Sequence, residues 1–195
     1  MIRFFTTLCK SELEKLSDKD IFHKATNGFS NYNERCPNCG AVGKLSPYGE
    51  YFRNLVSHNG KSTTESNIGI LRFECVSCNK THALLPDIII PYSPYSLRFI
   101  LTVLAAYFER NTTVVAVCEH FGIAVSTLYK WKHRLLEHKD LLLGMLTSLK
   151  EPVQIFLRGL FVSLRLSDQL SVFFRRYGFS FLQNRSTKAT RSQPP

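Results

Sequence analysis

The residues with the clearest capacity for chemistry are four cysteines in two pairs of identical spacing: Cys36, Cys39, Cys75 and Cys78. Two residues between cysteines allow a tight turn to aim both sulfurs at one ion, and structural zinc takes four such ligands tetrahedrally. Pro37 and Gly40 suit the first turn, because proline restricts the backbone and glycine tolerates a positive φ. The spacing therefore predicts one Zn²⁺ ion bound by all four cysteines.

Redox chemistry and disulfide bonding are the alternatives for such pairs. A thioredoxin-like dithiol lies between a strand and a helix of a βαβ unit, and neither pair has that context. Three disulfides would need an oxidising compartment. The first residues reach Lys10, Glu12 and Glu14 before the apolar core of a secretion signal could form. We therefore expect an intracellular, cytoplasmic protein with a metal site.

Other histidines and cysteines are secondary candidates. His58 and His82 are possible substitute ligands, and His82 lies four residues after Cys78. Packing against a hairpin, or exposure at the surface, is the more common role for such histidines. Cys9 and Cys118 stand alone, and we expect both to be buried apolar thiols.

The loop between the cysteine pairs must contain structure of its own. Its 35 residues exceed the roughly 15 to 20 of the simplest zinc pattern. Residues that favour strands occupy 48–56 and 68–74, and a polar stretch at 57–67 lies between them. This predicts a zinc ribbon over residues 36–92 with a protruding hairpin tip. The proline-containing segment 84–94 is expected to be a linker packed on the ribbon.

A helical region follows the predicted ribbon. Apolar residues recur at helical spacing over 95–110. Thr112 or Thr113 can cap a second helix through Glu119, and Gly122 can end it with a positive φ. Ser126 is predicted to cap a third helix that runs to about residue 138.

The apolar positions around Gly122 fit a helix-turn-helix domain at 93–140. They are Val117, Phe121, Ile123, Leu128 and Trp131. In this interpretation the first two positions face the last two across the turn, and Ile123 fills the corner. An ordinary pair of antiparallel helices with a solvated basic face is the alternative.

The third helix would then present hydroxyl, aromatic and basic side chains to the major groove of double-stranded DNA. These candidate DNA-binding residues are Ser126, Thr127, Tyr129, Lys130, Lys132, His133 and Arg134. No acidic residue interrupts the sequence from Phe121 to Arg134. A net charge of +10, from 25 lysines and arginines against 15 acidic residues, also suits a nucleic-acid partner.

The two ends of the chain are less informative. The N-terminal segment 1–35 predicts one short helix over 10–22. Residues 141–183 predict an amphipathic helical region, and 184–195 a disordered basic tail. The polar stripe of the amphipathic region comprises Gln154, Arg158, Arg165, Gln169 and Arg176. Its apolar side comprises Ile155, Phe161, Val162, Leu166 and Phe173. No apolar run is long enough for a membrane span. The expected fold class is α+β: a small β zinc ribbon, an all-α helix-turn-helix domain and a C-terminal amphipathic helix.

The order of these motifs over residues 36–138 resembles the N-terminal DNA-binding part of bacterial insertion-sequence transposases. A related domain family without a known function shares this order. The motifs are the two cysteine pairs, the Leu84-Leu-Pro86 segment after His82, and the helix ending Ser126-Thr-Leu-Tyr-Lys-Trp131. The resemblance implies a bacterial, mobile-element-associated protein whose ribbon and helix-turn-helix bind DNA.

The catalytic domain of such transposases is not evident in this chain. Two-metal strand transfer needs several carboxylates on a folded scaffold. After Asp140 the sequence contains only Glu151 and Asp168 as acidic residues. We therefore predict a DNA-binding protein that is not an enzyme and could act with itself or a transposition partner. The alternatives are a protein-interaction adaptor, and an accessory or truncated transposase that works with a catalytic partner.

Overall fold

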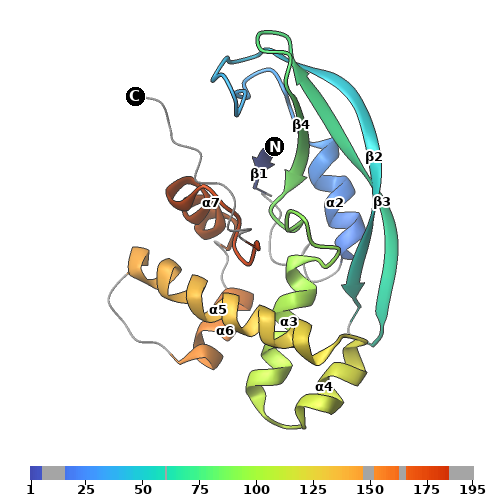
Figure 1. Ribbon diagram of the computed structural model, residues 1–195, viewed down its shortest axis with the longest axis vertical. Helices are drawn as coiled ribbons and strands as arrows, with labels where there is room; N and C mark the ends of the chain where they lie inside the picture. Colours follow the sequence, from blue (N-terminus) through green and yellow to red (C-terminus); the bar gives the residue numbers. More distant parts are fainter. Residues whose placement is uncertain (6–15, 60, 147–151, 163–165, 185–195) are drawn as a thin grey trace.

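The computed structural model describes residues 1–5, 16–59, 61–146, 152–162 and 166–184 (Figure 1). These residues form a four-stranded sheet and a group of helices, so the α+β class is confirmed. The strands are β1 (Ile2–Phe4), β2 (Leu45–His58), β3 (Thr63–Cys75) and β4 (Thr81–Pro86). Their order is β1-β4-β3-β2, with β1 parallel to β4 and the other neighbours antiparallel.

The hairpin of β2 and β3 is longer than predicted. The polar stretch 57–67 was expected to protrude as a tip, but most of it continues the two strands, with Ser57 opposite Thr64 and His58 opposite Thr63. The hairpin end is not free either, because the Thr63 hydroxyl donates to the carbonyl of Phe121 at 3.0 Å. Strand pairing satisfies the backbone of this polar segment, so polarity alone did not mark a loop.

A helix covers one face of the sheet. Helix α2 (Asp18–Asn27) begins at Ser17, whose hydroxyl accepts the amide of Asp20. Ile21 and Phe22 are buried in one cluster with residues of the sheet, including Ile68. The predicted helix over 10–22 therefore begins later and ends later within the described residues. Positions 10–15 of that prediction lie outside the described residues, and so does Cys9, which was predicted to be buried.

The segment 84–94 is part of the core and not a linker. Its first residues belong to β4, and Leu84, Leu85 and the run 88–90 are all buried. Leu84 packs in the cluster that contains Cys36 and Cys75, whereas Leu85 packs in the cluster under α2. Alternate residues of a strand point to opposite faces, so this apolar segment contributes to both clusters.

Five helices of the described residues follow the hairpin: α3 (Leu97–Glu109), α4 (Val114–Phe121), α5 (Val125–Leu146), α6 (Val153–Val162) and α7 (Leu166–Tyr177). Helices α3 and α4 lie at one end of the hairpin, whereas α7 lies near β1 (Figure 1). Phe99 of α3 packs against α4 and α5, with its ring centroid 6.1 Å from that of Trp131 and 6.0 Å from that of Phe121. Apolar residues of all five helices belong to one buried cluster.

The C-terminal region differs from the predicted single amphipathic helix. It contains α6 and α7 as separate helices, and Ile155 of the predicted apolar side is 54% exposed. Phe156, Leu157 and Leu160 are buried instead, and Phe173 is buried as expected. Helices α6 and α7 each bury their own set of apolar residues, so one continuous wheel over both assigns the wrong residues to the core. The predicted basic tail lies outside the described residues, apart from Asn184. No helix in the described parts of the chain combines the length and apolarity required to cross a membrane.

Candidate metal centre and helical surface

The first cysteine pair forms a tight backbone turn. The Cys36 amide donates to the Ala41 carbonyl at 2.9 Å, and the Gly40 amide donates back to the Cys36 carbonyl at 2.9 Å. Gly40 has φ of +74°, a conformation in which glycine has no Cβ to strain. The turn also brings the Asn38 amide to 3.4 Å from the Cys36 sulfur.

The second pair repeats the same backbone pattern. The Cys75 amide donates to the Lys80 carbonyl at 3.0 Å, and the Asn79 amide donates to the Cys75 carbonyl at 2.8 Å. Asn79 occupies the position that corresponds to Gly40 and has φ of +54°. Asparagine adopts the left-handed region more readily than most residues. Two equivalent turns therefore present two sulfurs each.

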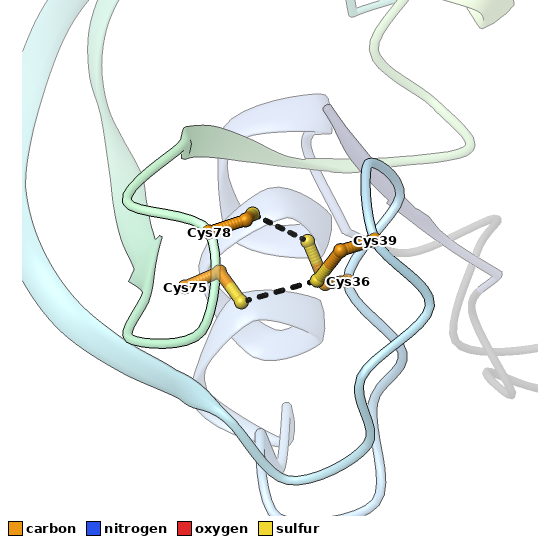
Figure 2. Close-up of side chains that lie close together, drawn as sticks. All are labelled: Cys36, Cys39, Cys75 and Cys78. Carbon is orange, nitrogen blue, oxygen red and sulfur yellow. Dashed lines mark hydrogen bonds between the residues drawn. The ribbon is translucent and has the colours of Figure 1, made fainter.

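The two turns face one another and place four sulfurs in one group (Figure 2). Cys36 Sγ lies 3.7 Å from Cys78 Sγ, and Cys39 Sγ lies 3.7 Å from Cys75 Sγ. All four sulfurs lie within 4.8 Å of one another. A disulfide requires about 2.05 Å between sulfurs, whereas metal–sulfur bonds of about 2.3 Å in a tetrahedron separate the sulfurs by about 3.8 Å. The four cysteines predicted as ligands therefore form a group that could bind a metal ion.

The turns also alter the ionisation of the thiols. Burial opposes ionisation of Cys36, but hydrogen bonds from the Cys39 and Asn38 amides and the neighbouring thiols lower its pKa to about 6. The Ala41 amide favours the Cys39 thiolate. Desolvation and the adjacent sulfurs of the cluster outweigh that contribution and raise the Cys39 pKa to about 12. Four thiolates in one group repel one another, and a bound cation would relieve that repulsion.

The cluster is closed on one side and open on the other. Cys36 and Cys75 are buried, Cys78 is half-buried and Cys39 is exposed. Ile2, Leu45, Phe73 and Leu84 pack in the same buried cluster as Cys36 and Cys75. The sheet therefore supports two of the ligands from behind, and the other two lie toward solvent.

The two histidines considered as substitute ligands have different positions. His58 lies at the opposite end of the hairpin, with its ring centroid 5.0 Å from that of Phe121. His82 is only 6% exposed, and its Nε2 lies 3.3 Å from Cys36 Sγ. It is nevertheless not a member of the four-atom group that fits one ion. Cys118 is buried in the helical core, as predicted.

The α4–α5 pair forms the second candidate site. Thr113 caps α4, where its hydroxyl accepts the Ala116 amide at 3.2 Å. Gly122 ends the helix with φ of +65°, and the Ile123 amide then donates to the Cys118 carbonyl at 3.0 Å. The five apolar positions predicted around this turn are all buried: Val117, Phe121, Ile123, Leu128 and Trp131.

The start of α5 differs from the prediction. The helix begins at Val125, and the Ala124 carbonyl accepts the amides of Thr127 and Leu128. Ser126 therefore lies within the first turn and does not cap the helix. This shift leaves its side chain exposed.

The seven predicted DNA-binding residues fall into two groups. Ser126, Tyr129, Lys130 and His133 are exposed, whereas Thr127, Lys132 and Arg134 are half-buried. Burial lowers the pKa of Arg134, and the adjacent Glu137 partly offsets that effect. The exposed group lies in the N-terminal half of α5. Further along the helix, the exposed residues Glu137 and Asp140 add negative charge to the surface.

Lys132 has a partner that sequence analysis did not identify. Its ammonium lies 3.0 Å from the Tyr107 hydroxyl and 5.3 Å from the centre of the Tyr107 ring. Tyr129 provides a second ring, 5.6 Å away. Tyr107 belongs to α3, so no local spacing along α5 could have revealed this contact.

The fold and the cysteine cluster define a mixed α+β protein with a candidate four-cysteine metal site. Residues 36–131 match a family model described as a domain of unknown function, DUF6431. The matched region begins at the first cysteine of the cluster and ends at Trp131 in α5. No curated protein and no solved structure matches the chain.

Proposed function

We propose that this protein is a zinc-containing DNA-binding protein, in which α4 and α5 act as a helix-turn-helix and α5 enters the major groove. The observation that carries the proposal is the exposed stripe of Ser126, Tyr129, Lys130 and His133 on α5, directly after the capped turn at Gly122. These side chains supply hydroxyl and nitrogen groups for base edges and one permanent positive charge for phosphate.

The packing of α5 supports this orientation. Leu128, Trp131 and Leu135 are buried on the opposite side of the helix. Lys132, held by Tyr107, would lie at the margin of the contact. The half-buried Arg134 would add less than the sequence prediction implied. The predicted interface therefore narrows to the four exposed residues.

Zinc would serve the fold of the ribbon and not the reading of bases. The cysteine cluster contains four sulfur ligands and is supported by buried apolar residues, which is typical of a structural zinc site. The hairpin then connects the cluster to α4 through the contact of Thr63 with Phe121. Loss of zinc would loosen the ribbon end first and weaken DNA binding indirectly.

The test combines metal analysis with a binding titration. Zinc content of the purified chain is measured, and fluorescence anisotropy follows its binding to a random-sequence duplex over a series of salt concentrations. We expect stoichiometric zinc and an affinity that falls steeply with salt. The double variant Lys130→Ala with His133→Ala should bind about tenfold more weakly. Its salt slope should also be smaller by about 0.9, the contribution of one phosphate contact.

Lys19→Ala is the matched control, because Lys19 is an exposed lysine on α2, away from the α4–α5 pair. It should leave affinity and salt slope unchanged. Equal binding by wild type and the double variant would remove α5 from the interface. Stoichiometric zinc without DNA binding would favour the adaptor function.

One observation favours that second candidate function, a protein-interaction adaptor. Tyr48 and Phe52 of β2 are 56% and 65% exposed, and exposed aromatic residues are enriched at interfaces. In the adaptor proposal the hairpin contacts a partner protein. Replacement of both residues by serine should then abolish capture of that partner without any change in zinc content.

We further propose that the chain is related to the DNA-binding part of insertion-sequence transposases and performs no strand cleavage itself. The motif order over 36–138 supports the relation. Incubation with labelled duplex DNA and Mg²⁺ or Mn²⁺ should produce no cleavage. Metal-dependent cleavage would instead identify a transposase or nuclease activity.

A further inference from the structure

His82 has one ring nitrogen against a cysteine sulfur and the other against a main-chain nitrogen. Its Nε2 lies 3.3 Å from Cys36 Sγ, and its Nδ1 lies 3.3 Å from the main-chain nitrogen of Met1. The side chain is 6% exposed, and its strand β4 pairs with both β1 and β3. The imidazole is therefore held in place by the sheet before any metal binds.

The donor and acceptor roles in these two contacts depend on the tautomer of the imidazole. In one tautomer the Met1 N–H group donates to Nδ1. A neutral imidazole with an acceptor at Nδ1 has its proton at Nε2. The Nε2–H group then points at Cys36, whose sulfur is an acceptor as a thiolate.

The same geometry argues against His82 as a metal ligand. The four cysteine sulfurs form a compact group within 4.8 Å, and the His82 nitrogens do not complete such a group with them. A ligating nitrogen must also present a lone pair, whereas Nε2 carries the proton in this arrangement. The cluster already supplies the four ligands of a tetrahedral site.

We propose that His82 is a positioning residue of the metal centre, whose Nε2–H group donates a hydrogen bond to the metal-bound thiolate of Cys36. This inference rests on the metal site in the proposed function. The hydrogen bond withdraws negative charge from one of the four adjacent thiolates. It also fixes the orientation of the Cys36 side chain, as outer-shell partners do for ligands at other metal sites. Within the cluster, the sulfur that His82 contacts belongs to the buried Cys36, whereas Cys39 is exposed.

The test compares zinc transfer from the full chain to a chromophoric chelator. We expect His82→Leu to release zinc about 10-fold to 100-fold faster than wild type. His82→Gln retains an N–H donor and should fall between them. The matched control is His23→Leu, at an exposed histidine of α2 outside the cluster and the proposed DNA interface, and it should behave as wild type. Circular dichroism in excess zinc confirms that each variant is folded.

Two measurements separate hydrogen bonding from ligation. The Co²⁺-substituted protein should have the same absorption spectrum in wild type and His82→Gln, because the sulfur ligand set is unchanged. Nitrogen NMR of the zinc-loaded wild type should show a protonated Nε2. This measurement does not depend on whether any variant folds. A changed cobalt spectrum or an unprotonated Nε2 would overturn the proposal.

Equal zinc-transfer rates for all folded variants would overturn the role of His82 and leave the metal site intact. A wild-type chain that binds no zinc would overturn the metal site itself. The two failures are therefore distinguishable.

Discussion

The cysteine cluster and the outward face of α5 differ in what positions their side chains. In the cluster, two short backbone turns with the same hydrogen-bond pattern place the sulfurs. On α5, packing against other helices decides which side chains remain exposed. All four predicted cysteines come together, whereas three of the seven predicted α5 residues are half-buried. The spacing of residues in the sequence predicts local backbone turns. It does not predict how a helix is rotated about its own axis when it packs in the core.

The largest effect should come from a buried ligand. Cys75→Ser removes a sulfur with no exposed surface, and we expect loss of stoichiometric zinc together with unfolding of the ribbon end, because structural metal binding and folding are coupled. Zinc analysis and circular dichroism measure both. Cys118→Ala is the control, since Cys118 is buried outside the cluster. It should retain zinc, and zinc loss in that variant would contradict the assignment of the ligands.

The core beneath α5 should respond next. Trp131 is 4% exposed and packs edge-on against Tyr95, with ring centroids 4.9 Å apart. We expect Trp131→Ala to lower the free energy of unfolding by about 3 to 5 kcal/mol, as measured by chemical denaturation in the presence of zinc. Tyr129→Ala, on the exposed side of the same helix, should cost far less. Equal losses would mean that α5 is rotated from the orientation described above.

The two turn glycines allow a direct comparison of the regions. Gly40 and Gly122 have φ of +74° and +65°, and a Cβ at either position would meet no atom within 4 Å. Alanine should therefore cost only the backbone strain, about 1 to 2 kcal/mol at each site. Gly40→Asn should cost less, because Asn79 already occupies the equivalent place in the second turn. Thermal unfolding of the zinc-loaded variants measures these losses, and a much larger loss at one glycine would reveal a further constraint there.

The smallest effect should appear at the end of the hairpin away from the cysteine cluster, where His58 packs against α4. Burial lowers the pKa of His58 below its ordinary value of 6.5, with a further contribution from His120. Because the unfolded chain binds this proton more readily, the contribution of neutral His58 is complete above pH 6.5 and is lost as the pH falls toward the folded pKa. Denaturation curves between pH 7.5 and 5.5 should therefore show a slight loss of stability. The dependence should be weaker in His58→Gln, and an identical pH dependence in both proteins would contradict this role.

Much of the fold was predictable because its signals are local. A capping threonine at 112 or 113, a glycine at 122 that tolerates a positive φ, and the apolar spacing around it predicted α4 and its turn. The predictions were wrong where long-range contacts overrode local composition. The polar hairpin end became strand because β2 and β3 pair through it, and the segment 84–94 became core because both sides of β4 are covered.

The candidate site follows the same division. The pairs of cysteines and the turn residues beside them specify the ligands, because two intervening residues and a left-handed position define where both sulfurs point. The meeting of the two turns, the contact of His82 with Cys36 and the capture of Lys132 by Tyr107 required the folded chain. Each of these contacts joins residues at least 25 positions apart, and only the packing of distant strands and helices brings such residues together.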